Sequence, residues 1–82
     1  MGCLSRIREF YPGFTSSEQK IADFILGNAD HALECTAAEL SVASGVSPAT
    51  VIRFTKTIGF SGFSEMKLNL ARDMEASIPD EM

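Results

Sequence analysis

The chain has 82 residues, of which 45% are hydrophobic, and a formal net charge of −4 at pH 7. A chain of this length is near the lower end of the domain range, so it predicts one small domain with a modest core. It has no signal peptide and no apolar run approaching the roughly 20 residues that span a bilayer, so we expect a cytoplasmic protein without a membrane partner.

The acidic net charge argues against a nucleic-acid binder, because such proteins usually present a basic surface. The distribution of charge removes most of this difficulty. The last ten residues hold four acidic side chains and no basic one. Between Leu40 and Ser64 the only charged residues are Arg53 and Lys56, so the middle of the chain is weakly positive.

A short first helix is predicted near the N-terminus. Leu4, Ile7 and Tyr11 fall on one side of it, at the three- and four-residue spacing of a helix. The Pro12-Gly13 pair is expected to end it, because proline lacks the backbone donor that a continuing helix needs.

A second helix is predicted to begin at a capping box formed by Thr15 and Glu18 and to close near Gly27-Asn28. One further helical turn is expected at residues 30–33. The inward positions of the second helix are Ile21, Phe24 and Ile25, and the outward positions are Glu18, Gln19, Lys20 and Asp23.

Residues 36–63 carry the pattern of a helix-turn-helix, a unit that usually places its second helix in the major groove of DNA. Thr36 and Glu39 form a capping box that opens the first of the two helices. Its apolar edge is predicted at Leu40 and Ala43. Gly45 suits the left-handed backbone of the turn, and Val46 is expected as a buried anchor between the helices.

The second helix of this unit is predicted at about residues 48–58. Ser47 is placed to cap it, and Pro48 is tolerated in the first turn, where its missing N–H costs nothing. Gly59 ends the helix. One face is apolar and is expected to pack inward through Val51, Phe54, Thr55 and Ile58.

The opposite face is the predicted DNA-binding surface. Small residues at its N-terminal end allow a close approach to base edges, and arginine or lysine can bind guanine or phosphate. Arg53 is the expected specificity residue and Lys56 an expected phosphate contact. The alternative is that this face is only solvent-exposed surface without a binding role. That alternative explains poorly why the apolar Ile52 lies on this face. The predicted contacts on this helix are Ser47, Pro48, Ala49, Thr50, Ile52, Arg53 and Lys56.

A last helix is predicted after Ser61, which is expected to cap it. The free N–H groups at its start, together with Ser61 and Lys67, form the second predicted DNA contact, because they suit a phosphate. Its apolar stripe is expected to serve as core or as a dimer seam, and consists of Phe63, Met66, Leu70 and Met74. The complete fold prediction is an all-α, compact bundle of about five short helices that contains a helix-turn-helix.

Catalytic, cofactor and metal sites are not expected. The chain has one histidine, no Ser-His-Asp set and no metal-ligand spacing. Cys3 and Cys35 are too far apart for a CxxC motif and are interpreted as free thiols. His31 is interpreted as a helix-end or surface residue. The alternative to DNA binding is a helical protein-interaction module, which a weak salt dependence of binding would reveal.

The motifs resemble the N-terminal domain of RpiR-type bacterial transcription regulators, from about residue 7 to residue 71. Two departures from the family pattern are Ser41, where alanine is usual, and Ile58, where leucine is usual. The positions that carry the resemblance are Phe14, Thr15, Glu18, Ile21, Ala22, Val46, Ser47, Thr50, Val51, Arg53, Phe54, Ile58, Gly59, Phe60, Gly62, Phe63 and Lys67.

This resemblance implies a regulator of sugar-metabolism genes with a second domain. RpiR-type regulators are similar to two-domain proteins. In these proteins a C-terminal, sugar-isomerase-type domain senses phosphorylated sugars. The expected division is a DNA-binding domain at residues 1–76 and the start of a linker at 77–82, so a phosphosugar effector would act only through the absent domain. The chain is therefore expected to be either an excised DNA-binding domain, which we favour, or a natural short protein.

A homodimer is expected on double-stranded DNA. One helix-turn-helix makes few contacts, so two copies on a near-palindromic site are the usual arrangement. The predicted seam is either the first helix, through Leu4, Ile7 and Tyr11, or the stripe from Met66 to Met74.

Overall fold

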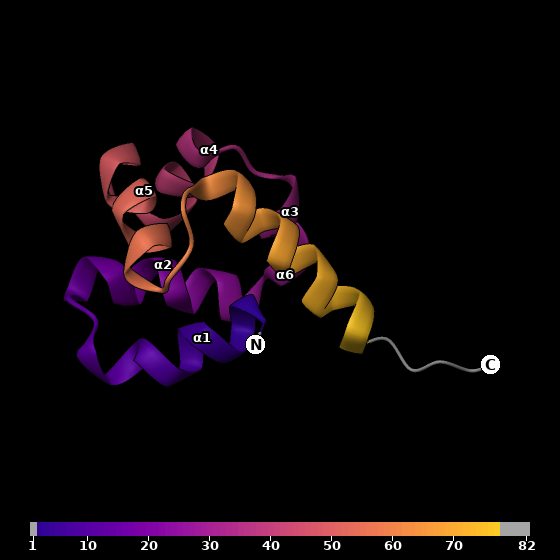
Figure 1. The fold of residues 1–82 in the computed structure, drawn as a ribbon. Helices are drawn as coiled ribbons and strands as arrows, with labels where there is room; N and C mark the ends of the chain where they lie inside the picture. The colour runs from indigo at the N-terminus through magenta and orange to yellow at the C-terminus, as the bar shows by residue number, and fades with distance from the viewer. Residues whose placement is uncertain (1, 78–82) are drawn as a thin grey trace.

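The computed structural model describes residues 2–77, which form six α-helices, one 3₁₀ turn and no β-strand (Figure 1). The predicted all-α class is confirmed, and the predicted turn at 30–33 is a full helix. None of these helices has both the length and the apolar character needed to cross a membrane. The elements are α1 (Cys3–Phe10), η1 (Tyr11–Gly13), α2 (Ser16–Gly27), α3 (Ala29–Glu34), α4 (Ala37–Ser44), α5 (Pro48–Thr57) and α6 (Phe63–Ser77).

The helices form two groups that share one core. Helices α2, α4 and α5 pack against one another, while α6 packs against α1, α3 and α5 (Figure 1). Helix α6 continues through Ser77, the first residue of the predicted linker, and residues 78–82 lie outside the described range. The arrangement leaves one side of α5 without a covering helix, because Ala49, Ile52, Arg53 and Lys56 are exposed.

The core is a single apolar cluster to which every helix contributes. Phe54 of α5 is its largest fully buried side chain. The Phe14 ring lies 5.2 Å from that of Phe54, which ties the turn before α2 to α5. The buried apolar residues are Cys3, Ile7, Phe14, Ile21, Ala22, Ile25, Ala32, Cys35, Leu40, Val51, Phe54, Ile58, Phe60, Met66 and Leu70.

Both predicted capping boxes are present. The Thr15 N–H donates to the Glu18 carboxylate at 2.9 Å, and the Glu18 N–H donates back to the Thr15 hydroxyl at 3.2 Å. The same pair of bonds joins Thr36 and Glu39 at 2.9 and 3.1 Å. These reciprocal bonds satisfy backbone donors that a helix start would otherwise leave free, which explains where α2 and α4 begin.

The predicted inward face of α4 is partly wrong. Ala43 is exposed, and Ser41 is buried beside Leu40 instead. The Ser41 hydroxyl donates to the Ala38 carbonyl of the same helix at 2.6 Å, so this polar group is satisfied where the family usually has alanine. Val46, expected as a buried anchor, is only half-buried.

The predicted dimer seams are wrong in part, because their central side chains belong to the core of the same chain. Ile7 on α1 and Leu70 on α6 have no exposed surface, and Met66 is 1% exposed. Leu4 and Tyr11 are half-buried against the same cluster. An amphipathic stripe predicts that a face is covered but not by what, and here α1 and α6 cover each other.

Candidate nucleic-acid interface

The turn between α4 and α5 depends on Gly45. This residue has φ 77°, in the left-handed region that residues with a Cβ resist. Its N–H bonds back to the carbonyls of Ser41 and Val42, and the Val46 N–H donates to the Ser41 carbonyl at 2.9 Å. These bonds close the end of α4 and direct the chain into α5, as the sequence predicts.

Helix α5 begins at Ser47, whose hydroxyl accepts from the Thr50 N–H at 3.2 Å, with Pro48 in the first turn. The Ser47 and Thr50 hydroxyls lie 2.9 Å apart and share a hydrogen bond. Thr50 is half-buried, so it supports the cap more than it extends the exposed surface. The helix ends at Thr57, one residue before the predicted limit.

The predicted phase of α5 is confirmed. The four residues expected to face inward, Val51, Phe54, Thr55 and Ile58, have no exposed surface. The outward surface, called here the reading face, is formed by the exposed residues Ser47, Pro48, Ala49, Ile52, Arg53 and Lys56.

The reading face has a free basic end. Within residues 2–77 the Arg53 guanidinium and the Lys56 ammonium make no hydrogen bond or ion pair, so neither is folded back onto an acidic side chain. Ile52 beside them is 37% exposed and adds an apolar group to this surface. Both cations are therefore available to an anionic partner.

The same, C-terminal end of α5 is held by a residue that the sequence does not single out. Arg6 of α1 donates from Nη1 to the Ile58 carbonyl at 3.1 Å and to the Gly59 carbonyl at 3.2 Å. Its guanidinium carbon lies 4.8 Å from the centre of the Phe60 ring. Gly59 has φ 96°, a backbone conformation that suits the glycine predicted to end this helix. No local pattern in the sequence identifies Arg6 as the side chain that covers it.

The start of α6 differs from its prediction. The helix begins at Phe63, so Ser61 stands one position too early to cap it. The Ser61 N–H donates to the Glu65 carboxylate at 2.6 Å, and this backbone bond, helped by the Ser61 side chain, lowers the pKa of Glu65. Lys67 donates to the Cys35 carbonyl at 3.0 Å and lies 5.6 Å from the Phe63 ring centre. Both predicted phosphate contacts thus have internal partners.

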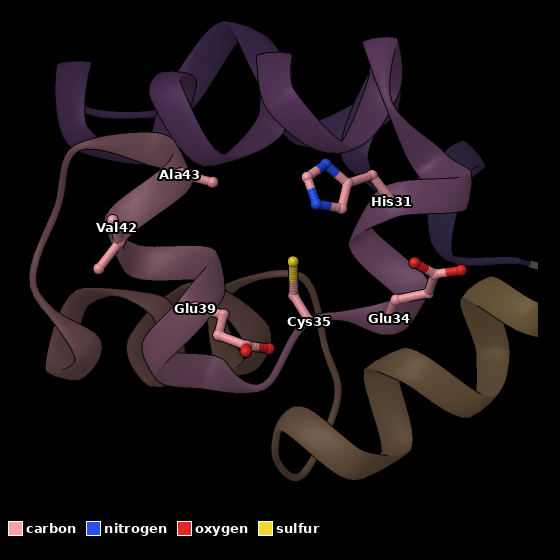
Figure 2. Close-up of a pocket in the computed structure, with 6 residues that line it drawn as sticks. All are labelled: His31, Glu34, Cys35, Glu39, Val42 and Ala43. Carbon is pink, nitrogen blue, oxygen red and sulfur yellow. The ribbon is translucent and has the colours of Figure 1, made fainter.

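A hollow of about 510 Å³ lies between α3 and α4 and includes no residue of α5. Figure 2 shows the Cys35 thiol on this hollow, with Glu34 and Glu39 on opposite sides of it and His31 across from it. Burial, and then the Glu39 charge, raises the pKa of the Cys35 thiol, which keeps it protonated and a poor metal ligand. Across residues 2–77, no three potential ligands are grouped as a metal site requires.

The sequence of the chain matches the helix-turn-helix domain of the rpiR family over residues 1–77. This chain belongs to the rpiR family. Like other helix-turn-helix domains of transcriptional regulators, this rpiR-family domain is a DNA-binding module, and the predicted resemblance is confirmed.

Relatives of this rpiR-family domain are regulators several times its length. An HTH-type transcriptional regulator of Haemophilus influenzae is 44% identical over 71 residues, which are 87% of this chain and 25% of the relative. YfhH, an HTH-type transcriptional regulator of Escherichia coli, is 36% identical over 80 residues, 98% of this chain and 28% of YfhH. The chain therefore spans about a quarter of the length of these relatives.

Solved structures share the fold of this rpiR-family domain. The N-terminal domain of the transcriptional regulator YbbH from Bacillus subtilis superposes with a TM-score of 0.81 at 36% identity, covering 84% of each chain. The Vibrio vulnificus NanR protein, solved in complex with ManNAc-6P, gives a TM-score of 0.87 at 31% identity, covering 92% of this chain and 28% of NanR. The helical arrangement described here is thus that of experimentally determined regulators.

Proposed function

We propose that this domain recognises a specific double-stranded DNA sequence by placing α5 in the major groove. The observation that carries the proposal is the reading face: its six residues are exposed, while the opposite side of α5 is fully packed. A second helix held rigidly behind a tight turn, with one side free, is the geometry that a helix-turn-helix presents to base edges.

The chemistry along the reading face suits this role. Ser47, Pro48 and Ala49 at the start of α5 are small and exposed, so the helix can approach base edges closely. Arg53, one turn further on, carries the planar donor fork that matches a guanine edge, and it has no competing partner among residues 2–77. We assign base recognition to Arg53, with Ile52 supplying apolar contact, for which a thymine methyl group is the fitting partner.

Phosphate contacts position the helix but do not read sequence. We assign this role first to Lys56, which is exposed and unpaired within the described part of the chain. Ser61 and Lys67 remain secondary candidates. They would reach phosphate only after releasing Glu65 and the Cys35 carbonyl, respectively.

We infer a role in the control of sugar-metabolism genes, with the sensing done outside this domain. NanR, which shares the fold, was solved with ManNAc-6P, and this chain covers 28% of it. The hollow between α3 and α4 is a poor alternative sensor, because its charged walls, Glu34 and Glu39, would repel a phosphate. A DNA-binding regulator works at the chromosome, so we also infer a cytoplasmic location and a binding, not a catalytic, activity.

In vitro selection tests DNA recognition directly. The wild-type chain is incubated with a pool of random-sequence duplexes, and the enriched duplex is compared with a shuffled duplex of equal composition in a salt series. We expect preferred binding of the enriched duplex and a steep loss of affinity with salt, since phosphate contacts release counterions. Absence of enrichment, or a flat salt series, would instead favour the protein-interaction module.

Replacing Lys56 with alanine should weaken binding to the enriched and the shuffled duplex by similar factors, and should reduce the salt slope by about one unit. The reason is the loss of one phosphate contact that carries no sequence information. Lys67→Ala serves as the comparison, and its effect on the slope should be smaller because Lys67 is already bonded to Cys35. An unchanged slope in Lys56→Ala would remove this assignment.

We propose a homodimer on DNA whose seam lies on α6 around Leu68. Leu68 is 52% exposed, whereas Ile7, Met66 and Leu70 of the predicted seams are at most 1% exposed. Val42 is more exposed, at 81%, but it belongs to α4, and the first helix of a helix-turn-helix crosses the DNA backbone.

Leu68→Glu should weaken self-association at least about tenfold in sedimentation experiments, because it places a charge in an apolar contact. Val42→Glu is the matched control and should leave self-association unchanged. A wild-type chain that stays monomeric at all concentrations yet binds a half-site tightly would contradict the dimer.

A further inference from the structure

Arg6 connects α1 to the C-terminal end of α5 in three ways. Its guanidinium donates to two consecutive carbonyls, those of Ile58 and Gly59, and it lies over the Phe60 ring. A Cβ on Gly59 would overlap this guanidinium, so the turn is shaped closely around it. Arg6 is only half-buried and comes from a helix that contributes nothing to the reading face.

These contacts act at the C-terminal end of α5, where the Gly59 N–H also donates to the Lys56 carbonyl and the Phe60 N–H to the Thr55 carbonyl. The last carbonyls of a helix lack partners within the helix and carry partial negative charge, so a cation there both satisfies and stabilises them. Arg53 and Lys56 lie in the last turns of α5, directly before Ile58. If this end of the helix frayed, both side chains would move relative to the bases. The contacts of Arg6 therefore affect the orientation of Arg53 and Lys56 toward DNA.

Helix α1 is itself held in place from α6. The Asp73 carboxylate accepts from the Leu4 N–H at 2.8 Å, at the start of α1, where a negative charge is favourable. Any side chain on Gly2 would collide with this carboxylate. Asp73 therefore connects the start of α1 to α6, and Arg6 connects the middle of α1 to the end of α5.

We propose that Arg6 is a positioning residue for DNA recognition: it holds the C-terminal turn of α5 in the geometry that aims Arg53 and Lys56, and Asp73 holds α1 so that Arg6 can do this. This role rests on the proposed DNA-reading function of α5. In this role Arg6 acts through the backbone of residues 58 and 59 and through the Phe60 ring, and not by contacting a base.

The test compares Arg6→Gln with Arg8→Gln in the 82-residue chain. Arg8 is on the same helix, exposed and free of described contacts, so its replacement removes the same charge without touching α5. Affinities are measured for the duplex enriched by the wild-type chain and for a shuffled duplex, with thermal melting recorded for each variant.

Arg6→Gln should lower the ratio of enriched to shuffled affinity roughly tenfold, because binding must then order the end of α5. Arg8→Gln should leave the ratio unchanged. Arg6→Lys, which retains a cation with a single donor nitrogen, should recover part of the ratio. Without DNA, hydrogen exchange at the Gly59 and Phe60 amides should be faster in Arg6→Gln only.

A double-mutant cycle tests the part of Asp73. Asp73→Ala should also lower the ratio, and its effect should largely disappear in the Arg6→Gln background, because both changes release the same contact. Fully additive effects would overturn the coupling through α1.

Three results would overturn the positioning role of Arg6. An unchanged ratio with only a lower melting temperature would make Arg6 a purely stabilising residue. Equal losses on both duplexes with a shallower salt slope would make it a phosphate contact. A wild-type chain that enriches no sequence would overturn the DNA-reading function, and with it the proposal for Arg6. If the wild type enriches a sequence but the affinity ratio is unchanged in Arg6→Gln, only the positioning role is overturned.

Discussion

Phe54→Ala is expected to unfold the domain or to leave it barely folded. Phe54 has no exposed surface and packs its ring 5.2 Å from that of Phe14, at the junction of α5 with the rest of the core. Truncating a buried phenylalanine costs roughly 3–5 kcal/mol. A domain of this size has a total stability near the low end of about 5–15 kcal/mol, so the loss removes most of it. Helical circular dichroism during urea titration measures the effect.

The control for this prediction is Ile52→Ala, two residues away on the same helix. Ile52 is partly exposed on the reading face, so its truncation should change the free energy of unfolding by no more than about 1 kcal/mol. It should still weaken DNA binding. A Phe54→Ala chain that melts like the wild type but no longer binds DNA would mean that Phe54, and not Ile52, faces the bases.

Arg53→Ala is expected to cost roughly 1–3 kcal/mol in affinity for the enriched duplex and clearly less for a shuffled duplex. The guanidinium is exposed and unpaired within the described residues, so its removal leaves no internal partner unsatisfied. The loss should therefore appear in DNA binding and not in the melting temperature. Titrations of both duplexes at one fixed salt concentration measure the difference.

Arg53→Lys separates charge from geometry. Lysine keeps the positive charge but lacks the planar fork that bonds two acceptors of one guanine. Binding to the shuffled duplex should recover, while the preference for the enriched duplex should stay low. Equal losses on both duplexes in Arg53→Ala would reassign Arg53 to a phosphate.

The sequence alone determined the features that depend on neighbours along the chain. The capping boxes at Thr15 and Thr36 bond residues three apart, and the left-handed turn at Gly45 depends on one residue type. The phase of α5 follows from the spacing of its apolar residues. All of these are local, so residue type and spacing are sufficient to predict them, and they specify the helix-turn-helix and its reading face.

Only the tertiary structure decided what the remaining faces and charges contact. Arg6 donates a hydrogen bond to the Ile58 carbonyl, 52 positions away in the sequence, and Lys67 donates one to the Cys35 carbonyl, 32 positions away. The stripe containing Met66 predicts a covered face, but its partner is this chain's own core and not a second copy. Such contacts depend on how the helices cross, which no spacing in the sequence encodes. For this reason the surface proposed to read DNA could be predicted from the sequence, whereas the residue proposed to position that surface could not.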